Sequence, residues 1–362
     1  MLAKSLLEGY SFGSVQGSKY SAAEGPNLIA METAMELRDI YESTFYKIDE
    51  LELTAYAASM ESADQSVQEG IGSSIKSAMT SLYKKVKEML IKLKNKILGW
   101  LSNARRLMDG IFMSGAEFAT KYEKQLKALN LSGYEIVDAP DYDHKKIDDG
   151  ETAEAIKFDT IADKEAVQFA KNIMESASSS GSTAAFHNEE IDNQQKQQAE
   201  TLEKNWEKSI GQCLPAGIEY DSINVAALRK AYFIELLGGD PEGDNIGTTT
   251  YTVDISYVIK TLKGGNKILS KLKANESKTK SSFDKVITAL EKAEKTSTDQ
   301  GNTGAAALIK AHTRIFTASR NMGMAMTGAM IDATKHRIAF FKKVATGAFS
   351  YSRKKDKADK QK

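Results

Sequence analysis

Apolar residues recur every three or four positions through the long stretch from Ile71 to Phe112. This spacing predicts a single amphipathic helix with a length of about 60 Å. The opposite face is cationic, with Glu88 as its only acidic residue before Asp109. The candidate contact residues on that face are Lys84, Lys85, Lys87, Lys92, Lys94, Lys96, Arg105 and Arg106. One apolar stripe and one cationic stripe suit assembly with other helices or contact with an acidic surface.

Only four prolines occur in the 362 residues, at Pro26, Pro140, Pro215 and Pro241. Long intervals without a helix breaker strongly favour helix. A chain of this length can bury one substantial core or form two to three modest domains. We therefore expect a mainly α fold of long amphipathic helices in helical hairpins or bundles, with at most a few short strands.

The formal net charge of zero conceals alternating charged blocks. Residues 1–70 hold 4 basic and 12 acidic side chains, net −8, and residues 71–130 hold 12 and 4, net +8. Residues 131–203 hold 6 and 17, net −11, whereas residues 301–362 hold 13 and 3, net +10. Such blocks can pair within one chain, between subunits or with outside partners, and we expect internal or subunit pairing first.

The chain divides into regions by composition. An extended arm rich in glycine and serine is followed by a helical region, an acidic connector that ends in a serine-rich linker, a second helical region and a basic tail. The expected ranges are 1–25 for the arm, 26–130 and 183–352 for the helical regions, 131–182 for the connector with its linker at 176–182, and 353–362 for the tail. Lys354 and Lys355 of the tail are further candidate contacts.

The acidic stretch 27–60 has its own helical apolar spacing and precedes the basic helix 71–112. An antiparallel hairpin of the two would place opposite charges side by side. Further along, 134–140 is either a short strand or an extended connector. The stretch 248–259 is the best strand candidate, although Asp254 could equally cap a helix. The methionines and small residues of 321–330 are expected to pack in a core.

The sequence contains no recognisable catalytic constellation. Cys213 is the only cysteine, so an intrachain disulfide is excluded, and a small buried side chain is its expected role. The four histidines are scattered and supply no visible base for a nucleophile. The acidic residues after Pro140 match no calcium-loop spacing and are expected to form a solvated turn. We therefore expect no enzymatic activity, no cofactor and no metal.

Charge interrupts the N-terminal residues too early for a secretory signal, and no apolar stretch is long enough to span a membrane. Together with the long helices and the aromatic residues of the arm, these features resemble internal or minor structural proteins of large tailed bacteriophages. Leu6-Leu7-Glu8 before Gly9 is similar to the short sites cut by some phage prohead proteases. The resemblance implies a virion protein, made in the host cytoplasm, whose partners are other copies of itself or other structural proteins.

An alternative function is that of a membrane-active protein. The helix 71–112, with Trp100 and its lysines, has the composition of an interfacial helix that binds anionic lipid. This alternative weakens if the acidic helix 27–60 covers the cationic face. The basic tail could also touch nucleic acid, without sequence specificity.

Overall fold

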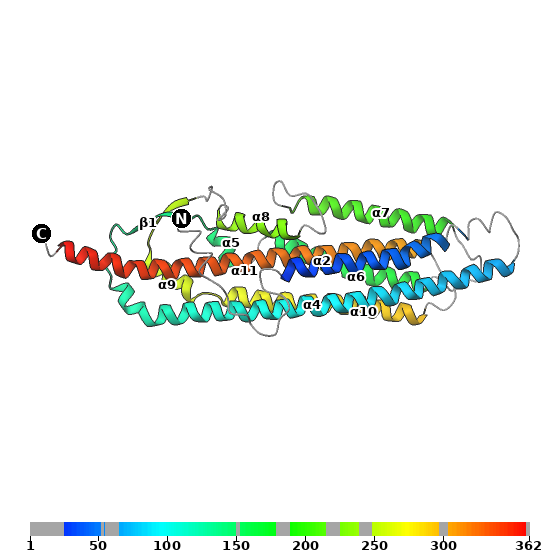
Figure 1. Cartoon of the computed structure of the whole chain (residues 1–362), viewed down its shortest axis with the longest axis horizontal. Helices are drawn as coiled ribbons and strands as arrows, with labels where there is room; N and C mark the ends of the chain where they lie inside the picture. Colours follow the sequence, from blue (N-terminus) through cyan, green and yellow to red (C-terminus); the bar gives the residue numbers. More distant parts are fainter. Residues whose placement is uncertain are drawn as a thin grey trace.

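The computed structural model describes residues 25–51, 54, 65–149, 153–178, 189–214, 225–238, 248–296 and 303–359. These residues form an elongated, mainly α bundle in which the longest helices run side by side (Figure 1). The expected mainly α fold is confirmed. Residues 1–24 of the expected arm 1–25, the end of the linker at 179–182 and the last residues of the tail, 360–362, lie outside the described residues.

The predicted basic helix is confirmed and is longer than expected. Helix α4 runs from Gln65 to Lys127 without a break, which corresponds to about 95 Å. The helix continues past the expected end at Phe112 and through Gly115, a glycine that lets the backbone of a neighbouring helix approach. A Cβ at Gly115 would lie 2.8 Å from the carbonyl oxygen of Leu262.

Helix α11, Thr303–Asp359, forms the centre of the bundle. Every residue from 315 to 326 is buried, so this helix is covered on all sides there. The methionine-rich run 321–330 therefore packs in the core, as expected. The helices that pack on α11 include α2 (Gly25–Ile40), α4, α6 (Ala153–Ser178), α7 (Glu189–Gly211), α8 (Val225–Leu237) and α9 (Ile255–Lys263).

The remaining helices complete the outer layer. The π-helical turn η1, Tyr41–Phe45, continues α2, and both elements contact α4. Helix α10, Asn266–Thr296, packs against α4 and α6. The short helix α5, His144–Asp149, occupies the acidic stretch that was expected to be a solvated turn.

A two-stranded antiparallel ribbon lies beside the C-terminal half of α11 (Figure 1). Strand β1, Glu135–Pro140, pairs with β2, Thr248–Thr252. Immediately afterwards, Asp254 accepts hydrogen bonds from the backbone N–H groups of Ser256 and Tyr257 and caps α9. Both possibilities for 248–259 are thus realised in succession, first the strand and then the capped helix.

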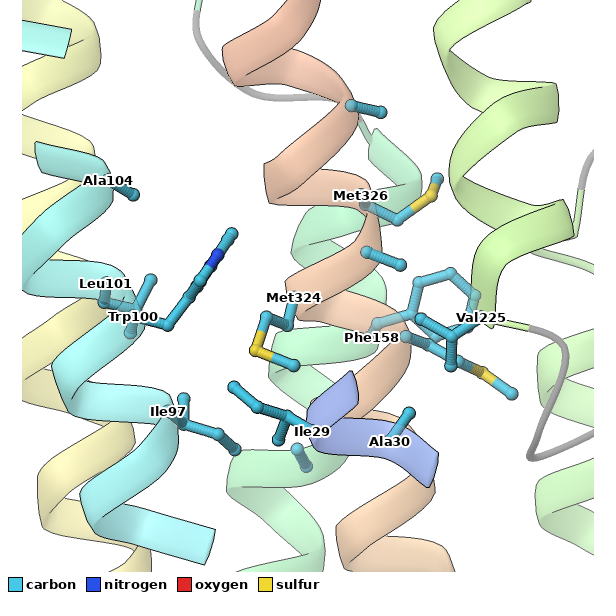
Figure 2. Packing of buried hydrophobic residues seen from close by; sticks show 14 of the residues in the cluster. Ile29, Ala30, Ile97, Trp100, Leu101, Ala104, Phe158, Val225, Met324 and Met326 are labelled. Carbon is cyan, nitrogen blue, oxygen red and sulfur yellow. The ribbon is translucent and has the colours of Figure 1, made fainter. Parts of the chain in front are cut away.

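One continuous hydrophobic core joins helices from both expected helical regions, from Ile29 to Ala348. Figure 2 shows side chains of α2, α4, α6 and α8 converging near Met324 and Met326 of α11. The expected connector 131–182 contributes to this core, because Phe158 and Phe169 of α6 are buried in it. Helix α6 extends to Ser178, into the first part of the expected linker.

Candidate functional site

The cationic face of α4 is covered on one side by α2 and η1. Lys96 lies 2.8 Å from Glu32 and 3.6 Å from Glu36. Lys92 lies 3.8 Å from Glu36. Lys85 donates hydrogen bonds of 2.9 Å to the hydroxyls of η1 at positions 43 and 44. The sequence positions of the partners increase from 32 to 44 as those of the lysines decrease from 96 to 85. The helices α2 and α4 therefore form the expected antiparallel hairpin.

The other side of the same face is covered by α10. Nζ of Lys87 lies 2.5 Å from the carboxylate of Glu294, and Nζ of Lys94 lies 2.5 Å from that of Asp284. At intervals of about two to three turns along α4, this pattern continues to Arg105, whose guanidinium lies 2.9 Å from Glu276. The partner helix α10 was not anticipated from the sequence, because its own charge is mixed.

The other predicted contact residues are scattered. Lys84 is exposed and makes no ion pair with a described residue. Arg106 is exposed and donates to Asn103 within its own helix, at 3.0 Å. Lys354 is exposed, whereas Lys355 donates to the Ser132 carbonyl at 2.9 Å and thereby fastens α11 to the loop after α4. The structure therefore does not gather the ten predicted residues into one open surface.

A buried ionic cluster, missed at the sequence level, surrounds Arg320 in the middle of α11. Arg320 is only 2% exposed and pairs with Asp163 and, at 3.2 Å, with Asp159 of α6. Ser282 of α10 donates to Asp163 at 2.5 Å. Burial, together with the nearby Asp163, raises the pKa of Asp159 to about 6, and the positive charge of Arg320 opposes this rise.

Close helix approach is a condition of this cluster. A Cβ at Gly323 would lie 2.8 Å from the Asp159 carboxylate. Only glycine therefore lets α6 bring that carboxylate against α11 without displacement.

A second buried group surrounds His312, nearer the start of α11 than the Arg320 cluster. His312 contacts the carboxylate of Glu165 through Nδ1, and its Nε2 lies 2.7 Å from the side-chain nitrogen of Asn172. The ring of Phe169 stacks on the imidazole at 5.2 Å. All three partners belong to α6, so these contacts fix the position of α6 along α11.

A third group connects α11 to the elements near the ribbon. Arg337, 3% exposed, pairs with Asp148 of α5 at 2.5 Å and donates to the hydroxyl of Tyr257 at 2.6 Å. The hydroxyl of Tyr142 lies 2.6 Å from Nδ1 of His336. Burial and the positive charges of Lys343 and Lys335 lower the pKa of His336 to about 4.

A fourth contact, between Arg229 of α8 and Asp332, attaches α8 to the same helix. Burial raises the pKa of Asp332, and the charge of Arg229 opposes the rise. Each of these charged groups of α11 therefore meets a partner from a different neighbouring helix or from a different turn of α6. A buried charge that finds its partner in one register alone specifies that register.

These groups have the geometry of structural ion pairs. Within the described ranges, no group of three or more His, Cys, Asp and Glu side chains is arranged to hold a metal ion. Cys213 is buried, and its thiol donates to the Ser209 carbonyl at 3.2 Å, in agreement with the predicted structural role. The sequence signal for the buried groups was the presence of charges at 320, 332 and 337 within the apolar stripe of 308–345.

No helix among the described residues contains an apolar stretch that could cross a bilayer. No protein family model, no curated protein and no solved structure matches this chain.

Proposed function

We propose that the chain is a non-enzymatic structural protein that makes helix-mediated contacts in a larger assembly, as a virion component of a tailed bacteriophage. The observation that carries this proposal is the neutralisation of the cationic face of α4 by carboxylates of α2 and α10. The pairs tie three helices into a rod, and α11 alone spans about 85 Å of it. The resemblance in sequence style supports the phage setting.

The same ion pairs weigh against the membrane-active alternative. An interfacial helix must present its lysines to lipid phosphates and its apolar stripe to acyl chains. In the bundle, Leu90, Leu93 and Ile97 of that stripe are buried, while Lys94 and Lys96 face carboxylates. Binding to lipid through this helix would require α2 and α10 to separate from α4.

The decisive experiment is to locate the chain in particles. Phage produced from the genome that encodes it would be purified on a density gradient, and the chain quantified by mass spectrometry and by immunogold labelling of intact and opened particles. We expect a fixed copy number per particle. Abundance in the lysate combined with absence from purified particles would refute the proposal.

A second measurement addresses the membrane alternative. Flotation of the purified chain with anionic liposomes across a salt series should leave the protein at the bottom of the gradient. Binding that salt reverses would move membrane activity to first place. If binding is seen, Lys84 is the suitable lysine to neutralise, because it is exposed. Neutralising Lys94 or Lys96 would also break ion pairs within the bundle.

A further inference from the structure

A groove of about 730 Å³ runs along the surface between α6 and α10. Its α6 side offers Val167, which is 53% exposed, and Met174. Its α10 side offers three lysines, Lys280, Lys285 and Lys292. The lining follows α10 over four turns, from 277 to 292, which corresponds to about 22 Å. The groove thus combines exposed apolar surface with a cationic edge and is long enough for several helical turns.

A second unusual surface lies on α2, η1 and the helical residues that follow. We call it the α2 stripe, and it consists of Met31, Met35, Glu42, Tyr46 and Glu50. Met31 is 48% exposed, Met35 is 60% exposed and Tyr46 is 71% exposed. Large apolar side chains that are exposed in a row on one helix face are characteristic of interaction surfaces.

The π-helical turn keeps this stripe straight. In an α-helix, residues four apart drift around the axis by about 40° per step. The wider π turn at 41–45 rotates less per residue and offsets that drift, so residues before and after it share a face. The stripe extends over about 28 Å, comparable with the length of the groove.

We propose that the α2 stripe of one copy docks in the α6–α10 groove of a second copy. This inference rests on the proposed assembly role and names its partner. Exposed residues of the stripe region carry four carboxylates, at 39, 42, 49 and 50, against the two bases Arg38 and Lys47. The groove carries three lysines against one carboxylate, Asp284, which already pairs with Lys94. Apolar surface and opposite charge therefore meet in the docked pair.

The two surfaces lie on different sides of the bundle. Helix α4 contacts both α2 and α10, and α11 contacts both α2 and α6, so these two helices separate the stripe from the groove. The α2 stripe of one copy therefore cannot reach the groove of the same copy. The contact is consequently head-to-tail, and its repetition builds a ring or an open filament instead of stopping at a symmetric dimer.

The test is sedimentation velocity of the full chain across a concentration series. Wild type should rise in mass above the 39.7 kDa of one copy. A groove variant with Lys280→Glu and Lys285→Glu, and a stripe variant with Met35→Ser and Tyr46→Ser, should each remain at the mass of one copy. A one-to-one mixture of the two variants still contains one intact stripe and one intact groove. The mixture should therefore form dimers and nothing larger.

The matched control is Lys273→Glu, which reverses an exposed α10 lysine outside the groove and should associate like wild type. Circular dichroism melts verify that every variant is folded. A wild-type chain that stays at one copy overturns the inference, as do variants that associate normally or a mixture that gives no dimer. Particle labelling decides the proposed function independently, so a virion protein that remains a single copy in solution would refute only the docking contact.

Discussion

Nζ of Lys96 on α4 lies 2.8 Å from Oε2 of Glu32 on α2, and this pair sets the register of the first helical hairpin. Both side chains are partly buried, so their attraction is less screened than that of a surface pair. Exchanging the two charges tests this relationship. Lys96→Glu alone should lower the free energy of unfolding by about 1 kcal/mol, and adding Glu32→Lys should recover most of the loss.

Urea unfolding of the four proteins in this double-mutant cycle gives the coupling energy. Lys84→Glu, at an exposed position of the same helix, should change stability by less than about 0.5 kcal/mol. A coupling energy of zero would show that the hairpin register has another origin.

Arg320 is the most consequential buried charge to remove. Arg320→Met should lower the free energy of unfolding by about 3 kcal/mol, because the partly buried Asp159 and Asp163 would lose their buried cation. Adding Asp159→Asn and Asp163→Asn should restore part of that loss. Chemical denaturation measures both effects, with Arg353→Met on the exposed part of α11 as the matched control. A loss no greater than that of the control would contradict the ionic cluster's structural role.

The pKa of Asp159 makes a signed prediction about pH. The pKa is 3.8 in the unfolded chain and about 6 in the folded protein, so the folded state binds this proton more tightly. The group's contribution to stability is therefore complete below pH 3.8 and is lost as pH rises through about 6. The difference in free energy of unfolding between Asp159→Asn and wild type should therefore shift in favour of the variant, by at most about 3 kcal/mol, when the pH rises from about 4 to about 7. Unfolding by urea at the two pH values measures the change. A constant difference would disprove the pKa assignment.

The lowered pKa of His336 predicts the opposite dependence of the free energy of unfolding on pH. Its pKa falls from 6.5 to about 4 on folding, so the unfolded chain takes up the proton first. The group's contribution is complete above pH 6.5 and is lost as pH falls through about 4. His336→Gln retains a hydrogen-bonding partner for Tyr142. On acidification, this variant should lose less of its free energy of unfolding than wild type, by at most about 3 kcal/mol. Burial also lowers the pKa of the nearby His144, so some acid sensitivity should persist. Titration of His336 near 6.5 in the folded protein, followed by NMR, would exclude this prediction.

The helices were predictable because their cause is local. Apolar spacing of three and four marks α4, α10 and α11, and the scarcity of proline removes the interruptions. Even the capping role of Asp254 was visible in the sequence. The close approach of Leu262 to Gly115 was not, because Leu262 belongs to a helix far along the chain.

The partners of the charged residues were less predictable, because they too depend on helices that are distant in the sequence. The pairing of α2 with α4 followed from neighbouring blocks of opposite charge. The contribution of Glu294 and Asp284 did not, because α10 has little net charge and its acids are recognisable as partners only once it packs on α4. The burial of Arg320 and Arg337 could not be predicted either, because their carboxylates come from α6 and α5, which are remote in the sequence.

The central position of α11 also determines when this protein can fold. Synthesis runs from the N-terminus, and α2, α4, α6, α7, α8 and α9 all precede α11 in the chain. Each of these helices therefore leaves the ribosome before the surface on which it packs exists. The part of their apolar surface that packs on α11 stays uncovered until residues 303–359 emerge. The bundle then closes around a helix that arrives after its neighbours, and synthesis of that helix sets the earliest moment of assembly.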